Sequence, residues 1–308
     1  MIYTCTLNPS LDYFMELNKE IEFSKTNRSQ LEYYEAGGKG INVSIVLSNL
    51  MIPSRAFGFL GGFTKDFYIS LLQRNEYLQP SFTYIDGHTR INVKAKDSNH
   101  NIDLNSAGPI ITSSNMEHLK KKISRLDEND ILVFSGSVLS YLEESSEDII
   151  KTCIDNGVRV VLDTSSNLTK NCLEYKPILI CPEIENLEEI TGIICDCEEK
   201  IIEAGKKCFS LGAQNVMIYL KHDPALFISA DGVFKAKTIK RDGKSIDTVG
   251  TQDAMVAGFV MSLLRTKDTK ECFRYANCCK EATLFTKNLE IRNDINDIYK
   301  QLEVEQIQ

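Results

Sequence analysis

Short apolar runs alternate with amphipathic stretches along most of this 308-residue chain. The runs with strand character are residues 2–7, 54–60, 131–134, 159–162, 178–181, 215–219 and 225–229. The stretches with helical character are residues 116–126, 146–156, 198–211, 251–264 and 270–286. Such alternation is typical of a parallel sheet with helices on both faces. The pattern therefore predicts an α/β fold.

Two other segments, residues 27–35 and 89–96, alternate polar and apolar side chains with a period of two. This period is typical of an antiparallel sheet with one face exposed to solvent. We expect these segments to form a small lid, together with parts of residues 11–26 and 97–108.

Composition limits the classes of partner. The net charge of −8 argues against nonspecific binding of nucleic acid, although it leaves room for a local basic pocket. The ten cysteines lack the paired spacing of a zinc site, and no signal peptide or membrane-length apolar run is present. We expect a reduced cytoplasmic protein with no membrane partner, in which most cysteines are small core residues.

One segment carries a pattern suited to phosphate chemistry. Residues 247–253 are polar and turn-prone, and they run directly into the apolar, small-residue segment 254–259. The first turn of such a helix offers unpaired N–H groups and a positive dipole end to an anion. Asp253, at the junction, could take a proton from an attacking hydroxyl. The alternative is that Asp253 only caps the helix.

A second segment is rich in glycine. Gly37, Gly38 and Gly40 surround Lys39, and Asn42 follows on the first turn of a predicted helix over 41–50. Glycines permit close approach of a ligand to the backbone. The spacing fits neither G-x-x-x-x-G-K-[ST] nor G-x-G-x-x-G, so an ordinary glycine-rich turn is the alternative.

Together, these two segments resemble the two signatures of the ribokinase-like (PfkB) carbohydrate kinases. Further matches follow in the family's order at residues 6–12, 27–28, 58–62, 89–94, 135–137 and 163–165. The string at 89–94 resembles the branch that contains 1-phosphofructokinase and tagatose-6-phosphate kinase. The resemblance implies one ribokinase-like domain over residues 1–308, with a doubly wound, mostly parallel sheet. Its lid would be formed by about 11–36 and 87–108, and a homodimer through the lid is plausible.

The resemblance also implies roles on the acceptor side. The sugar phosphate would contact Asp12, Arg28, Gly38, Lys39, Asn42, Arg90 and Ser137. Independently, Arg90, Asn92 and Lys94 are two apart on a strand and so face one side, which suits a dianionic phosphate. The alternative is a solvated strand face. Asp253 matches the family's catalytic base, and we expect it to be ionised near neutral pH.

The donor side departs from the family pattern. The anion hole, usually Gly-Ala-Gly-Asp, is Gly250-Thr251-Gln252-Asp253. If the third position needs a left-handed backbone, Gln252 costs roughly 1–2 kcal/mol; if it needs close approach, Gln252 crowds the phosphate. On either interpretation, Gln252→Gly should raise ATP affinity or rate.

The other departures also lie on the donor side. The usual Pro-Asn-x-x-Glu, which helps to place Mg²⁺, is Pro-Glu-x-x-Asn here, so Glu183 and Asn186 have traded ends but still share a helix face. A lysine that normally precedes the proline is Cys181. The family's Ser-Leu-Gly is Tyr-Leu-Lys here, at residues 219–221. Its Ala-Gly-Ser-Ala is Cys-Lys-Glu-Ala, at residues 279–282. The residues expected to contact ATP are Glu183, Asn186, Tyr219, Lys221, Thr248, Gly250 and Lys280, with Glu183 and Asn186 at Mg²⁺.

Two functions follow from this distribution. In the first, the protein phosphorylates a ketohexose monophosphate to the bisphosphate with ATP and Mg²⁺, and the side chains of Lys221 and Lys280 recreate lost phosphate contacts. In the second, it is a noncatalytic sugar-phosphate binder or regulator with a degraded nucleotide site. Arg90 and Lys94 argue against an unphosphorylated sugar or a nucleoside as acceptor.

Overall fold

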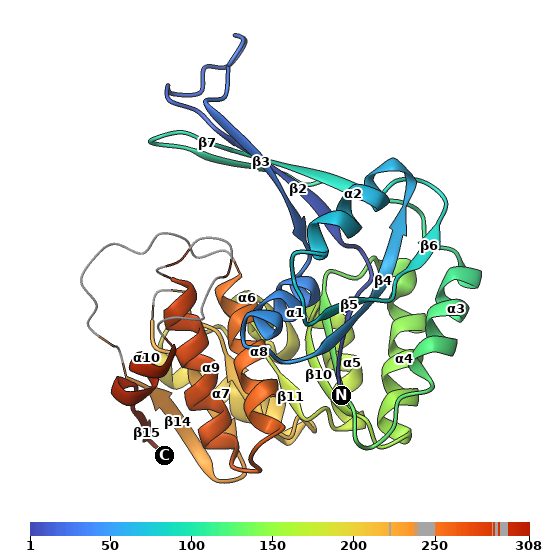
Figure 1. The fold of residues 1–308 in the computed structure, drawn as a ribbon. Coiled ribbons are helices and arrows are strands. Elements are labelled where there is room, and N and C mark those ends of the chain that lie inside the picture. Colours follow the sequence, from blue (N-terminus) through green and yellow to red (C-terminus); the bar gives the residue numbers. More distant parts are fainter. Residues whose placement is uncertain (222, 238, 240–249, 285, 287–288, 290–294) are drawn as a thin grey trace.

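The computed structural model describes the chain except for residues 222, 238, 240–249, 285, 287–288 and 290–294. Its main sheet has the strand order β15-β14-β13-β12-β11-β10-β9-β1-β4-β5, with β6 also paired to β4 (Figure 1). The strands from β5 to β12 run parallel, and β13 to β15 extend the sheet in antiparallel pairs. The predicted mostly parallel α/β sheet is confirmed.

The strands have the following bounds: β1 Ile2–Thr6, β4 Ser54–Gly61, β5 Leu78–Pro80, β6 Thr83–Ile85, β9 Ile131–Gly136, β10 Arg159–Thr164, β11 Leu179–Ile180, β12 Val216–Ile218, β13 Leu226–Ser229, β14 Gly232–Ala236 and β15 Val304–Gln306. The chain first adds β4 on one side of β1 and later returns to add β9 on the other side. This reversal is a topological switch point, and in open α/β sheets ligands bind beyond the carboxyl ends of the strands there.

Helices cover both faces of the sheet. One core contains side chains from α3 Ser113–Ile123, α4 Glu143–Asp155, α5 Ser166–Cys172, α6 Ile184–Thr191 and α7 Glu198–Ser210. The opposite core contains side chains from α1 Lys39–Asn49, α8 Thr251–Leu263, α9 Thr269–Thr283 and α10 Ile295–Gln301. Successive residues of the central strands alternate between these cores, as Leu132 and Val133 do. This arrangement is the predicted doubly wound one.

Helices α2 Gly62–Leu72, α5 and α10 lie outside the helical stretches predicted from the sequence. Helix α2 does carry a helical signal: its buried residues are Thr64, Tyr68, Leu71 and Leu72, which lie one turn apart on a single face. No helix within the described ranges is long and apolar enough to cross a bilayer.

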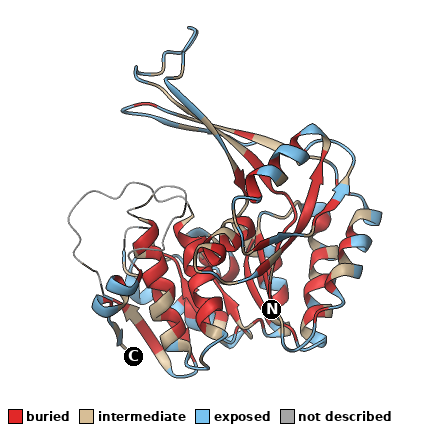
Figure 2. Cartoon of the chain, viewed as in Figure 1, coloured by how far each residue is buried: buried red, intermediate tan, exposed pale blue. Residues whose placement is uncertain are grey.

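A second sheet projects from the body, with the order β3-β2-β7-β8 (Figure 1). Its strands are β2 Ser10–Glu16, β3 Leu31–Gly37, β7 Arg90–Lys96 and β8 Asn101–Leu104, and we call this sheet the lid. Most of the lid is exposed or half-buried, whereas the central strands and α8 are buried (Figure 2). Stacked ring pairs join β2 to β3 at Tyr13–Tyr34 and Phe14–Tyr33.

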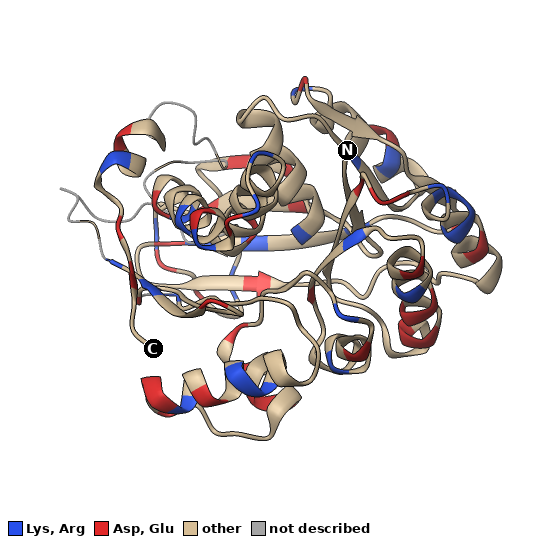
Figure 3. Cartoon of the chain, turned by 90° about the horizontal axis from the view of Figure 1, so that it is seen from below, with Lys and Arg blue, Asp and Glu red and all other residues tan. Residues whose placement is uncertain are grey.

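Charged side chains of both signs are interspersed on the helices around the sheet (Figure 3). Several form ion pairs between neighbouring helices or strands, such as Lys120–Asp148 and Lys235–Glu198. Exposed pairs of this kind contribute little to stability, since water and salt screen them. The exposed charges therefore do not mark a binding site. The candidate active site is identified instead by its partly buried ionisable groups.

Candidate active site

The register of the lid assembles the acceptor side. Asp12 on β2 lies opposite Asn92 on β7, and Asn92 Nδ2 donates to Asp12 Oδ1 over 2.9 Å. Ser10 Oγ donates to the same oxygen over 2.7 Å. Gly37 closes over this carboxylate so tightly that a Cβ there would lie 2.4 Å from Asp12 Oδ2. Burial raises the pKa of Asp12, while Ser10, Lys94, Asn92 and Arg90 oppose the shift.

Arg90 and Lys94 lie on the strand register with Asn92, as predicted, but both are engaged. Arg90 donates through Nε to Asn8 O at 3.1 Å and through Nη1 to Ser106 O at 3.2 Å. Lys94 Nζ lies 3.3 Å from Asp103 Oδ1 on the neighbouring strand β8. In this conformation the two cations hold the base and the edge of the lid.

The structure does not bring Arg28 to this group. Arg28 lies in the segment between β2 and β3 at the far end of the lid, whereas Arg90 pairs with Ser10 at its base. Seven residues of β2 separate the two ends, and a strand rises about 3.3 Å per residue. Arg28 and Arg90 of one chain therefore do not share a phosphate in this conformation. Ser137 is exposed in the loop that follows β9.

The two signature segments meet at Asp253. Asn42 Nδ2, on the first turn of α1, donates to Asp253 Oδ2 on the first turn of α8 over 2.8 Å. Among the described residues, the buried Oδ1 of Asp253 has no hydrogen-bond partner. Asp253 thus presents a buried oxygen beside the helix N-terminus at Gly250, where an attacking hydroxyl could donate its proton.

Burial works against the expectation that Asp253 is ionised near neutral pH. Burial raises the pKa of Asp253 to about 7, Lys39 lowers it, Asp163 raises it, and the bond from Asn42 lowers it. A raised pKa near neutral pH suits a group that must take up and release a proton.

Lys39 lies in an acidic cluster. Its Nζ is 3.0 Å from Asp163 Oδ1, 3.5 Å from Glu183 Oε1 and 3.3 Å from Gln252 Oε1. Burial alone would lower the pKa of Lys39, but Asp163, Asp253 and Glu183 outweigh it and raise the pKa. The predicted contact of Lys39 with the sugar stays a prediction. In this conformation its ammonium donates hydrogen bonds to the carboxylates of Asp163 and Glu183.

Neither expectation for Gln252 matches the structure. The left-handed residue of the anion hole is Gly250, with φ 74°, and Gln252 lies in the regular first turn of α8. Its side chain is buried, and Nε2 donates to Asp163 Oδ1 at 2.9 Å and to Cys181 O at 2.7 Å. Gln252 is thus unstrained, and its amide packs into the protein between β10 and β11.

Asp163 had no assigned role in the sequence analysis. It stands near the carboxyl end of β10, where it accepts from both Lys39 and Gln252, and its Oδ2 has no partner among the described residues. Burial raises the pKa of Asp163, and Lys39 opposes this shift. A carboxylate at the end of an otherwise apolar, buried strand was the signal that could have identified it.

On the donor side, Tyr219 OH and Thr251 Oγ1 are hydrogen-bonded at 2.7 Å, which ties β12 to the start of α8. Lys280 does not fit its predicted phosphate contact: its buried ammonium donates to Leu220 O at 3.0 Å and Asp223 O at 2.8 Å. It anchors the loop that carries Lys221, which is exposed. Thr248 lies outside the described residues.

Glu183 and Asn186 remain near each other at the start of α6. Glu183 precedes the helix and contacts Lys39, and Asn186 Nδ2 lies 3.5 Å from Thr164 O. In the described residues, no three His, Cys, Asp or Glu side chains form a metal cluster. The unpartnered oxygen of Asp163 and the half-exposed Glu183 carboxylate still suit Mg²⁺, since this ion commonly takes one or two carboxylates with phosphate and water.

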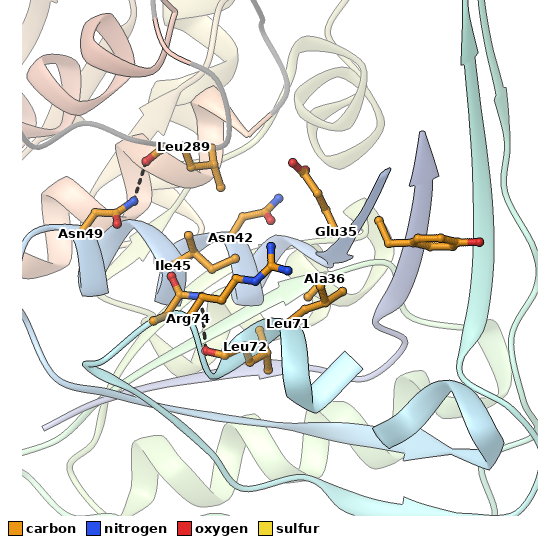
Figure 4. A pocket seen from close by; sticks show the side chains of 11 residues that line it. Glu35, Ala36, Asn42, Ile45, Asn49, Leu71, Leu72, Arg74 and Leu289 are labelled. Carbon is orange, nitrogen blue, oxygen red and sulfur yellow. Dashed lines mark hydrogen bonds between the residues drawn. The ribbon is translucent and has the colours of Figure 1, made fainter. Parts of the chain in front are cut away.

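A pocket adjoins the site along α1 (Figure 4). It lies between β3, α1 and the end of α2, and its lining includes Glu35, Asn42, Ile45, Arg74 and Leu289. Asn42 links it to Asp253. Leu289 also lines the pocket: its backbone oxygen accepts from Asn49 Nδ2 at 2.8 Å, and its side chain lies against Gly250.

Residues 6–293 match the family model described as pfkB family carbohydrate kinase, and the chain belongs to this family. The chain therefore has the ribokinase-like fold of this family.

Among its relatives, 1-phosphofructokinase of Borreliella burgdorferi is 36% identical over 100% of this chain and 99% of that protein. D-tagatose-1-phosphate kinase of Bacillus licheniformis is 31% identical over 99% of each chain. A solved structure from Staphylococcus aureus, provisionally described as a phosphofructokinase, is 34% identical, with a TM-score of 0.85 over 100% of this chain and 99% of that one.

Proposed function

We propose that this protein transfers the γ-phosphate of ATP to a ketohexose monophosphate and produces the bisphosphate, with fructose 1-phosphate as the first candidate acceptor. The observation that carries the proposal is the unpartnered Oδ1 of Asp253, at the N-terminus of α8 and joined to the acceptor side through Asn42. The full-length similarity to sugar-phosphate kinases supports this class of substrate.

In the proposed reaction, the acceptor hydroxyl donates to Asp253 Oδ1 and its oxygen attacks the γ-phosphorus of ATP. The new O–P bond forms, the bond to the β,γ-bridging oxygen breaks, ADP leaves, and the proton passes to Asp253. The N–H groups of residues 250–253 stabilise the charge on the transferred group. Mg²⁺, held near Glu183 and Asn186, would reduce the negative charge of the ATP phosphates.

Each acceptor-side residue has a part in this proposal. Asp12, oriented by Asn92, accepts from sugar hydroxyls, and Arg90 and Lys94 attract the sugar's own phosphate. Closure of the lid would exclude water and so limit hydrolysis of ATP. A homodimer through the lid remains part of the proposal, and any role for Arg28 depends on such an arrangement.

The second candidate is a noncatalytic sugar-phosphate binder. It is favoured by Lys280, whose ammonium is committed to two carbonyl groups and so does not replace the lost donor-side contacts. It is opposed by the retained Asn42–Asp253 pair, which a binder of sugar phosphate does not require.

A coupled assay of ADP release tests the proposal, with ATP and Mg²⁺ against fructose 1-phosphate, tagatose 1-phosphate, tagatose 6-phosphate and fructose 6-phosphate, and with a no-sugar control. Turnover with one acceptor above the control supports the kinase and identifies its substrate. Silence with all four, together with calorimetric binding of a sugar phosphate but not of ATP, overturns it in favour of the binder.

A further inference from the structure

Gln252 stands where the family resemblance places a glycine, and its amide is bonded at both ends. Nε2 donates to Asp163 Oδ1 and to Cys181 O, and Oε1 accepts from Lys39 Nζ. Only this orientation satisfies the site: a flipped amide would set its oxygen against a carboxylate and a carbonyl, and its NH₂ against an ammonium. The three groups around Gln252 therefore define one position for its side chain.

The same geometry links Gln252 to a second departure from the family pattern. Cys181, in place of a lysine, has its Sγ 3.8 Å from Gln252 Nε2 and supplies the carbonyl that accepts from it. A longer side chain directed as this thiol is would enter the space that the amide fills. The two substitutions are thus compatible as a pair, with bulk lost at residue 181 and gained at residue 252.

Lys39 connects this pair to the reaction. Its ammonium contacts Asp163, Glu183 and Gln252, and its charge also acts on Asp253. The Lys39 side chain is also about a third exposed (34%), so it is reachable from solvent. A flexible four-carbon stem permits many positions for such a charge, and each hydrogen bond that the ammonium donates removes some of them.

We infer that Gln252 is a positioning residue that, together with Asp163, holds the ammonium of Lys39 at the N-terminus of α8, facing the group to be transferred. The inference rests on the proposed kinase function and adds to it a role for this chain's own substitution. Phosphoryl transfer depends on placed charge more than on covalent chemistry, so a fixed ammonium lowers the barrier where a mobile one would not. The sequence pattern predicts that Gln252→Gly raises ATP affinity or rate. On this inference, the variant should instead have a lower kcat.

The first test is Gln252→Met, which keeps the length of the side chain and removes its hydrogen bonds. Because hydrogen bonds to charged groups are the stronger ones, we expect kcat to fall about tenfold or more, while KM for the sugar phosphate changes less than about twofold. The matched control is Gln214→Met, since Gln214 Nε2 also donates to a backbone carbonyl, that of Lys176, on an exposed surface. An unchanged or higher kcat in Gln252→Met overturns the inference.

A double-mutant cycle separates positioning from a direct role. Lys39→Met is prepared alone and together with Gln252→Met. If Gln252 acts through Lys39, its replacement has no further effect on kcat once Lys39 is methionine. A further tenfold loss in that background means that Gln252 acts by another route, and the inference is then wrong.

Amine labelling tests the position of Lys39 without turnover. A water-soluble acylating reagent is applied to the wild type, Gln252→Met and Gln214→Met, and modification of Lys39 is followed by mass spectrometry. We expect severalfold faster labelling in Gln252→Met only, because an ammonium without its hydrogen bond to Gln252 Oε1 is less restrained and more accessible to the reagent. Equal rates overturn the inference even if the wild type phosphorylates sugars. Conversely, a wild type silent in the assay of ADP release sinks the kinase proposal, whatever the labelling shows.

Discussion

The acceptor and donor sides of this site are built differently. On the acceptor side, regular strand pairing sets Asp12 opposite Asn92, and Gly37 closes over the carboxylate. On the donor side, side chains that depart from the family pattern bond to one another or to backbone, as Gln252 and Lys280 do. The comparison shows that backbone register can preserve one half of a site while side-chain contacts rearrange the other.

The largest expected effect is at Asp253, where the acceptor and donor sides meet. Asp253→Asn keeps the shape of the side chain and removes the proposed base, so kcat should fall by about 10²–10⁴-fold. Calorimetric affinity for the sugar phosphate should stay within about twofold of the wild type, because an amide can still bond to the acceptor hydroxyl. A comparable loss of affinity and turnover would show that Asp253 binds the sugar and is not the base.

The next effect should be confined to the acceptor side. Asp12→Asn leaves the donors Ser10 and Asn92 facing a weaker acceptor, so we expect KM for the sugar phosphate to rise about tenfold, with KM for ATP unchanged. Steady-state kinetics with each substrate varied in turn would measure both. An equal rise in the two KM values would mean that Asp12 affects the binding of both substrates, so that the acceptor and donor sides do not act independently.

The pH dependence of kcat/KM reports on the ionisation of Asp253. The base must be deprotonated, and burial raises the pKa of Asp253 to about 7. We therefore expect kcat/KM to be maximal above this pH and to fall about tenfold per unit below it. The ionisable groups around Asp253 are Lys39, Asp163, Glu183, Cys181 and Tyr219.

Lys39 lowers the pKa of Asp253, so Lys39→Met should move the midpoint of this profile to higher pH. Profiles of kcat/KM for the wild type and the variant, recorded at constant ionic strength, would show the shift. A flat profile in the wild type would remove Asp253 as the titrating base, and a shift to lower pH would contradict the assigned influence of Lys39.

The smallest effect should lie on the donor side. Lys280→Met removes two hydrogen bonds from a buried ammonium to the loop at Leu220 and Asp223, so we expect a loss of about 1–3 kcal/mol in stability and a modest rise in KM for ATP. Thermal unfolding and ATP kinetics measure these effects.

The exposed Lys221 provides the control for Lys280. Lys221→Met should leave the unfolding temperature unchanged, and it raises KM for ATP only if Lys221 contacts phosphate. If Lys280→Met weakens ATP binding strongly without loss of stability, Lys280 reaches the nucleotide directly and the assignment from this structure is wrong.

The sequence by itself determined the sheet, because runs such as residues 131–134 and 159–162 need only local apolar patterning to become buried strands. It also determined that Asn42 and Asp253 each lie on the first turn of a helix. Their contact, across 211 positions of the chain, was decided by the tertiary structure.

Only the tertiary structure decided the remaining features of the site. The Lys39–Asp163–Gln252 contacts join residues as far apart as 213 positions in the chain, and no local period reports on such a distance. The lid separates Arg28 from Arg90 because the length of β2 lies between them. The pKa of Asp253 depends on burial and on charges from several elements, and these quantities exist only once the chain is folded.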